Sequence, residues 1–274
     1  QNTFESATSI RSLDKQYNHH HGSNNEGATS IRRVDKQSNH HHDSNNDTGM
    51  FDMMQRRLYK IAIEPTTSSP QRKKYTLDAL KKGTGGLVDS DRLLLGDLYF
   101  NATSVFEYGV GESTGIAAYV GVPRYSGVDS DAVWVGNARK SAPNMDHFRF
   151  SFADIGNTKS YGNPTNNKLQ KIPLDYQSGP LNNEMEAFDI YLVDGRYRVA
   201  CVCASMLHAM SRGGDMSRVR VAMHDWAARD HYNPVLEVGD LVRKSDRLAV
   251  FKVKPDATEA DIYKVWEAHI WDQR

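Results

Sequence analysis

The sequence predicts a β-rich α+β fold, built on a mainly antiparallel sheet or sandwich, for which a jelly roll is one arrangement. From residue 86 to about residue 199, short apolar runs rich in Val, Tyr, Phe and Ile alternate with Gly, Pro, Asn and Asp clusters. Phe148, Phe150 and Phe152 alternate with polar residues, which is the period of a half-buried strand. Asp194-Gly195 separates two apolar runs and so predicts a β-hairpin.

The first 49 residues contain a tandem duplication. Residues 7–27 and 28–48 are two copies of a 21-residue unit, and fifteen positions are identical. Three heptads would suit a coiled coil, but each copy has only two aliphatic residues larger than alanine. This small apolar surface cannot offset the entropy lost when the chain becomes ordered. We therefore expect a disordered polar arm. The His triplets at 19–21 and 40–42 lack the spacing of a metal site, so no metal is predicted.

Residues 50–86 are expected to link this arm to the folded body. The apolar stretch 50–63 suits a short helix or strand that Pro65 ends, and 66–74 is a linker by composition. A short helical turn at 77–82 is followed by glycines. The body itself is predicted to span 87–274.

The body is expected to contain strands joined by turns, with one long loop. The predicted strands lie at 92–101, 103–108, 115–122, 132–137, 147–154 and 187–193 before the hairpin, and at 218–223, 235–241 and 248–253 after it. Residues 156–183 have the composition of a loop, and a loop of that length is usually functional.

Two helices are predicted after the hairpin. Residues 204–212 suit a short helix that Gly213 and Gly214 end. A capping pattern at 256–259 opens a C-terminal helix with one apolar stripe. The stripe should pack on the sheet or on another subunit, and it consists of Ile262, Val265, Trp266, His269 and Ile270.

Composition places the chain inside the cell. The 34 Lys and Arg balance the 34 Asp and Glu, and no apolar run is long enough to cross a bilayer. Cys201 and Cys203, two residues apart on a presumed strand, would hold their sulfurs apart. A reducing cytoplasmic or nuclear compartment follows.

Two patterns bear on chemistry. Gly109-Val110-Gly111 resembles a phosphate-binding loop only loosely, and because the next residues suit a strand, a hairpin turn and no cofactor are predicted. Cys203 precedes the presumed helix at 204–212, whose N-terminus would lower a thiol pKa, and His224 or His231 could act as its base. A small buried Cys explains the same residue, and we favour that interpretation over a catalytic one.

A basic block in the linker could contact phosphates. It has eight cations against Glu64 and Asp78, with tyrosines among them that could stack on bases. A charged linker or a nuclear-import signal explains the same residues equally well. The cations are Arg56, Arg57, Lys60, Arg72, Lys73, Lys74, Lys81 and Lys82.

These features together predict a non-enzymatic assembly protein. A polar arm, a basic linker and a β-rich body are the layout of viral coat, matrix and movement proteins, which is an analogy of organisation and not of sequence. We expect a homo-oligomer that contacts nucleic acid through the basic block. The alternative is a cysteine-dependent hydrolase that uses Cys203 with His224 or His231.

The arm provides the first testable prediction. Deleting residues 1–49 should change the melting temperature by less than about a few degrees, because a segment without a core buries almost no area. Calorimetry of the full and shortened chains measures this. A large loss of stability would mean that the arm docks on the body or on another chain.

Overall fold

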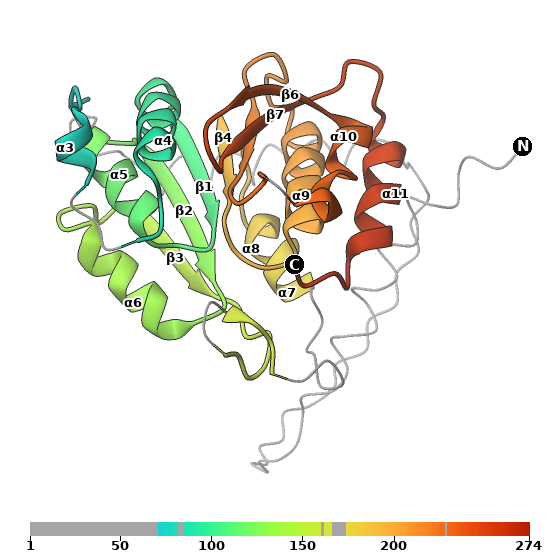
Figure 1. The fold of residues 1–274 in the computed structure, drawn as a ribbon, viewed down its shortest axis with the longest axis horizontal. Coiled ribbons are helices and arrows are strands. Elements are labelled where there is room, and N and C mark those ends of the chain that lie inside the picture. Colours follow the sequence, from blue (N-terminus) through green and yellow to red (C-terminus); the bar gives the residue numbers. More distant parts are fainter. Residues whose placement is uncertain (1–70, 82–84, 160–161, 166–173, 228) are drawn as a thin grey trace, which may run out of the picture. The chain divides into compact units, whose positions relative to one another are not determined.

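The computed structural model describes residues 71–81, 85–159, 162–165, 174–227 and 229–274. These residues all belong to one of the two compact units into which the chain divides, Pro65–Arg274. The unit is an α/β fold around a seven-stranded sheet with the order β3-β2-β1-β4-β5-β7-β6 (Figure 1). The arm and the residues up to 70 lie outside the described part, so the predicted domain boundaries remain predictions.

The predicted β-rich sandwich is wrong, because most of the sheet is parallel and helices cover it. β1 pairs in parallel with β2 and β4, and the parallel arrangement continues to β3 and β5. β7 runs antiparallel to both of its neighbours, β5 and β6. The strands are β1 (Ser104–Tyr108), β2 (Arg124–Asp129), β3 (Phe148–Phe152), β4 (Ile190–Val193), β5 (Arg220–Met223), β6 (Gly239–Lys244) and β7 (Ala249–Val253).

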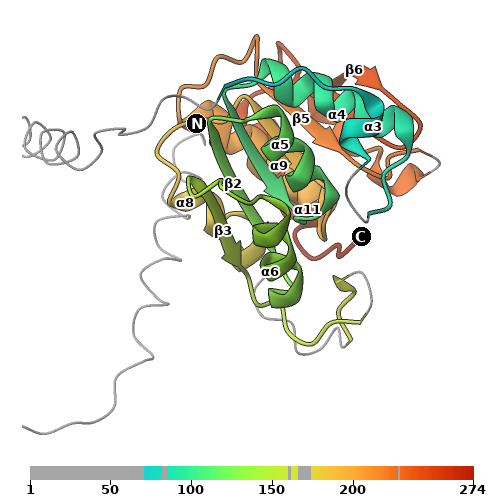
Figure 2. The ribbon, with the colours of Figure 1, turned by 90° about the vertical axis from the view of Figure 1, so that its left-hand side faces the viewer.

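Helices form a layer on each face of the sheet, as Figures 1 and 2 show. One layer contains α3 (Leu77–Leu80), α4 (Asp89–Asn101), α5 (Glu112–Val120) and α6 (Ala132–Ser141). The other contains α9 (Arg198–Ser211), α10 (Val235–Val238) and α11 (Glu259–His269), with the short α7 (Leu174–Gln177) and α8 (Gly179–Asn182). The 3₁₀ helix η2 (Asp230–Tyr232) precedes α10.

Alternate residues of each central strand enter separate cores. Val105 of β1 packs with α4 and α5, whereas Phe106 and Tyr108 pack with α9 on the opposite face. β1 and β4 are buried along their whole length, as parallel strands between two helical layers must be. β4 is a continuous apolar run, and β1 is apolar except for the buried Ser104 and Glu107, so neither shows the alternation of a half-buried strand.

Three segments predicted as strands are helices. Residues 92–101 belong to α4, 115–122 mostly to α5, and 132–137 to α6. α5 is buried on most sides, so its sequence lacks the polar face by which a surface helix is recognised. Residues 235–241 form α10 followed by the first part of β6, and β2 had been missed.

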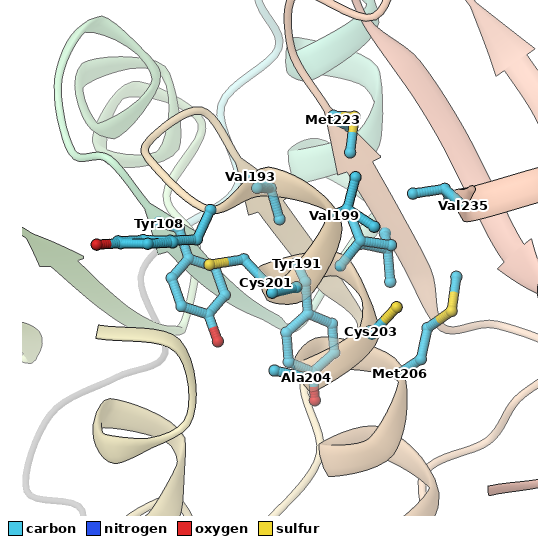
Figure 3. Packing of buried hydrophobic residues seen from close by; sticks show 14 of the residues in the cluster. Tyr108, Tyr191, Val193, Val199, Cys201, Cys203, Ala204, Met206, Met223 and Val235 are labelled. Atoms are coloured by element: carbon cyan, nitrogen blue, oxygen red, sulfur yellow. The ribbon is translucent and has the colours of Figure 1, made fainter. Parts of the chain in front are cut away.

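The predicted hairpin at Asp194-Gly195 is also wrong. The turn leads from β4 into α9, which crosses over to the parallel strand β5. α9 begins at Arg198, so Cys201 and Cys203 lie inside a helix and not on a strand. Figure 3 shows the two cysteines pointing apart in the core, Cys201 toward Tyr108 and Cys203 toward Met206.

The predicted C-terminal helix is confirmed as α11. Thr258 caps its N-terminus in a capping box with Asp261. Ile262 and Val265 are buried against α9, while Trp266 and Ile270 are only half-buried. The stripe therefore packs within the chain, and its use as a subunit interface remains a prediction.

No helix among the described residues is both long and apolar enough to span a bilayer.

Replacing Ile262 with Ala should lower the free energy of unfolding by about 2–5 kcal/mol, because it leaves a cavity between α11 and α9. Lys264→Ala on the exposed face of α11 should change it by less than about 0.5 kcal/mol. Denaturant unfolding of both variants measures this. Equal midpoints would show that α11 adds no packing energy.

Candidate functional site

The carboxyl edge of the parallel strands is where this fold places a site. β1 lies between β2 and β4, and the chain continues from β1 to β2 on one side and later returns to β4 on the other. Ligands of open α/β sheets bind where the strand order reverses in this way. The turns that follow β1, β2, β4 and β5 therefore form the candidate site.

A glycine turn joins β1 to α5, where a hairpin had been predicted. Gly109 has a φ of 83°, and a Cβ there would collide with the backbone oxygen of Asp194. A Cβ at Gly111, the N-cap of α5, would meet no atom within 4 Å. The first glycine thus lets β1 and β4 approach closely, and the second leaves the backbone open to a ligand.

Asp129 ends β2 beside this turn. Its carboxylate accepts hydrogen bonds from the backbone N–H of Val110 (3.1 Å) and of Asp131 (2.9 Å). Burial raises the pKa of Asp129 to about 6, although the backbone donors oppose the change. A half-buried carboxylate twenty residues after Gly109 suits recognition of a ribose hydroxyl.

The first residue of α5 makes its N-terminus unsuitable for a diphosphate. Glu112 accepts hydrogen bonds from Arg92 Nε of α4 (2.6 Å) and from the backbone N–H of Leu87 (3.3 Å). Its side chain is almost completely buried. The carboxylate bonds to groups outside α5, and its negative charge on the first residue of the helix disfavours a pyrophosphate there.

Below the turn, Glu107 of β1 is completely buried among hydroxyl groups. Tyr99 of α4 donates to one carboxylate oxygen (2.6 Å) and Tyr125 of β2 to the other (2.5 Å). Ser113 and Thr114 of α5 also donate to the second oxygen. Burial raises the pKa of Glu107, and these hydrogen bonds offset part of the increase.

Charged side chains gather at the ends of β4 and β5. His224 contacts Asp194 Oδ1 through Nδ1 (3.1 Å) and Asp91 Oδ2 of α4 through Nε2 (3.3 Å). Arg198 of α9 pairs with Asp194 (3.2 Å) and with Asp225 (3.1 Å). Asp225 also pairs with Arg229 (3.0 Å). We call these six residues the ion cluster.

The ion cluster has the donor set of a metal site but is neutralised without one. Oxygen and nitrogen atoms of Asp194, His224 and Asp225 lie within 4.8 Å of one another. Arg198 bridges the two carboxylates and so supplies the positive charge that a cation would bring. The donor set does not fit a metal while that guanidinium lies between its carboxylates.

Opposing effects set the protonation of the ion cluster. Burial lowers the pKa of His224. The hydrogen bond to Asp194 and the charges of Asp194, Asp225 and Asp91 raise this pKa by more than burial lowers it, so it lies above the ordinary value of 6.5. Burial raises the pKa of Asp225, but Arg198, His224 and Arg229 bring it below its usual value. The cluster therefore favours a charged imidazole between carboxylates.

Backbone strain occurs at the same edge. Tyr197 and Asp225 adopt left-handed backbone conformations, with φ of 56° and 59°. They follow β4 and β5, and Arg198 links the two turns through its bonds to Asp194 and Asp225. Strained non-glycine residues concentrate at functional sites, where surrounding contacts hold them in place.

The cysteine hydrolase that the sequence suggested is wrong. Cys203 lies in the interior of α9, not before its N-terminus, and is completely buried. Burial raises the pKa of its thiol, the opposite of what a nucleophile needs. His224 belongs to the ion cluster, and His231 is a half-buried residue of η2.

The basic block has varied roles in the described part of the chain. Arg72 donates to the carbonyl oxygens of Tyr99 (3.0 Å) and Ala102 at the end of α4. Lys81 pairs with Asp89 (2.8 Å), and Lys73 and Lys74 are exposed. Arg56, Arg57, Lys60 and Lys82 lie outside the described residues. Nucleic-acid binding by the block remains a prediction.

Sequence reasoning missed Asp129, Arg198, Asp194 and Asp91 as site residues. The spacing of twenty residues between Gly109 and an acidic residue was a usable signal. This spacing was not considered, because the residues after the glycines suited a strand and the glycine pattern was interpreted as a hairpin turn. The residues of the ion cluster come from four separate elements, so no spacing pattern in the sequence predicts that they lie together.

Comparison with known proteins gives a fold and no family. No family model matches the chain, and no curated protein does either. A solved methyltransferase-like protein from Silicibacter pomeroyi superposes with a TM-score of 0.57 at 23% identity, over 70% of this chain and 98% of that one. An O-methyltransferase from Bacillus cereus, solved with SAH, matches at a TM-score of 0.38 and 14% identity, over 77% and 93%. A TehB-like SAM-dependent methyltransferase from Corynebacterium glutamicum gives 0.35 and 13%, over 76% and 98%.

The first of these likenesses shows the fold. The α/β architecture that this chain shares with the methyltransferase-like protein overturns the predicted viral assembly protein. A homo-oligomer remains a prediction.

His224 should make stability depend on pH. Its pKa in the folded chain is raised, so its stabilising contribution is complete below about pH 6.5 and is lost as pH rises through the folded value. The difference in unfolding free energy between the parent and His224→Gln should therefore be larger at pH 6 than at pH 9. Chemical denaturation at both pH values measures it.

Asp194→Asn serves as the matched control for this prediction, because it removes the hydrogen-bond partner that most raises the pKa. In that background the pH dependence should shrink. A parent-to-variant difference that stays constant between pH 6 and pH 9 would contradict a charged His224.

Proposed function

We propose that this chain is a methyltransferase that uses S-adenosylmethionine. The proposal rests on one contact: the backbone N–H of Val110, in the glycine turn, donates a hydrogen bond to the carboxylate of Asp129. An open backbone and a carboxylate that would bind a ribose thus lie at the point where the strand order reverses. The shared fold of the methyltransferase-like protein supports the same assignment.

Glu112 favours this cofactor over a dinucleotide. A dinucleotide would put its pyrophosphate at the N-terminus of α5, where Glu112 lies paired with Arg92. S-adenosylmethionine carries a ribose but no phosphate, so it avoids this repulsion. The space beside Gly111 is open, and a side chain at this position would obstruct a bound nucleoside.

The residues of this edge would have distinct tasks. Asp129 would accept hydrogen bonds from the ribose hydroxyls, and the turn at Gly109 and Gly111 would let the cofactor lie against the backbone. When bound, the cofactor supplies an electrophilic methyl group on a sulfonium. The turns after β4 and β5, held rigid by Arg198, would border the acceptor.

Binding of S-adenosylhomocysteine, measured by calorimetry, tests the function. The parent should bind it, and affinity should fall as pH is lowered through about 6, because Asp129 then gains a proton and loses its charge. Asp129→Asn should bind about ten- to a hundredfold more weakly at pH 7.5, which is the loss of one charge-assisted hydrogen bond. It should also lose the pH dependence.

Asp146→Asn is the matched control, because Asp146 is exposed in the loop before β3, at the opposite edge of the sheet. It should bind like the parent. No binding of S-adenosylhomocysteine or S-adenosylmethionine to the parent at millimolar concentration would contradict the proposal.

A further inference from the structure

Arg196 lies at this edge and has no counter-ion among the described residues. It lies three residues after the end of β4 and is half-buried. Among the described residues, no carboxylate forms an ion pair with it, whereas Arg124, Arg149, Arg198 and Arg229 all have one. A half-buried charge that is left unpaired is unfavourable.

Asp194, whose charge acts on Arg196, is already paired with other side chains. Oδ1 of Asp194 already contacts Arg198 and His224. Burial lowers the pKa of Arg196, and the like charge of Arg198 lowers it further. The local field thus favours an added negative charge beside Arg196.

The guanidinium has unused hydrogen-bonding capacity. Nη1 donates to Asn163 Oδ1 (2.5 Å), but the buried Nε makes no hydrogen bond in the described part of the chain. Nε and Nη2 form the edge of an arginine that binds a carboxylate or phosphate through two parallel hydrogen bonds. An oxyanion there would give Nε the acceptor that it lacks.

Arg196 also lies close to the proposed cofactor site. A Cβ at Gly162 would be 3.1 Å from Ser130 Oγ and 3.8 Å from Arg196 Cγ, so both side chains flank the same point. Ser130 directly follows Asp129. In the sheet, β1 with its glycine turn lies between the strands that carry these two side chains.

We propose that Arg196 binds an oxyanion, a carboxylate or a phosphate, of a molecule that occupies the carboxyl edge of β1 and β4. The oxyanion comes from the amino-acid part of the cofactor or from the methyl acceptor, and an anionic acceptor is the substrate class in the second case. The inference rests on the proposed function only for the nature of that molecule.

The experiment uses the full chain and three probes: inorganic phosphate, S-adenosylhomocysteine and 5′-methylthioadenosine, which lacks the carboxylate. Phosphate binding is followed by the melting temperature at constant ionic strength, and the nucleosides by calorimetry. The variants are Arg196→Gln and Arg196→Lys. Arg218→Gln, an exposed arginine at the amino end of β5, is the matched control.

Each source of the oxyanion gives its own result. If it is the cofactor carboxylate, Arg196→Gln should weaken S-adenosylhomocysteine at least about tenfold and leave 5′-methylthioadenosine unchanged. If it belongs to the acceptor, both nucleosides should bind as to the parent, while the stabilisation by phosphate is lost. In either case Arg196→Lys should bind the probe affected by Arg196→Gln more tightly than Arg196→Gln does. Arg218→Gln should bind every probe as the parent does.

Two results separate this inference from the function. Stabilisation by phosphate that depends on Arg196, in a parent that binds neither nucleoside, would support the oxyanion site and reject the methyltransferase. Arg196→Gln that melts as the parent does without ligand, and binds all three probes as Arg218→Gln does, would overturn the inference. If Arg196→Gln fails to fold, Arg196→Lys decides by the same comparison of the three probes.

Discussion

A buried carboxyl group on the central strand organises the structure around it. Glu107 receives hydrogen bonds from Tyr99, Tyr125, Ser113 and Thr114, which belong to α4, β2 and α5. Without these donors a carboxyl at this depth would cost several kcal/mol, so the three elements must lie where their hydroxyls reach it. Thr114 in turn accepts the N–H of Gly111 (3.2 Å), which connects the buried group to the glycine turn above it. The shape of the proposed cofactor site thus depends on a completely buried polar group beneath it.

The carboxyl edge divides into two parts of different character. At β1 and β2 it offers open backbone, one half-buried carboxylate and a helix end already occupied by Glu112. At β4 and β5 it is crossed by ion pairs in which Arg198 and His224 lie between acidic side chains. In the proposed function the nucleoside binds at the first part, and the second part borders the methyl acceptor. Arg196 follows β4 and lies near Ser130 after β2, and no carboxylate among the described residues forms an ion pair with it.

The sequence predicted those parts of the fold that local pattern decides. β1, β3, β4, β5, β7 and α11 lie near the predicted positions because their apolar residues or caps are visible within a few residues. α5 was mistaken for a strand because packing on both sides removed its polar face, and that error hid the strand-to-helix turn at Gly109. Asp-Gly after β4 fits a hairpin and a crossover equally well, and only pairing with β5 distinguishes them. The ion cluster depends on this topology, so it could not be predicted before the topology was known.

Asp91 has a consequence for how the described body folds. One oxygen of its completely buried carboxylate accepts hydrogen bonds from Ser245 Oγ (2.6 Å), Arg247 N (3.1 Å) and Leu248 N (3.2 Å), and the other contacts His224. A side chain at the start of α4 therefore holds the connection between β6 and β7, which is translated more than 150 residues later. Closing so long a loop costs entropy that only the finished sheet offsets, so we expect these contacts to form late in folding. The first helical layer and the last two strands should then be gained and lost together, in a single cooperative transition, and fraying from either side of the body is suppressed.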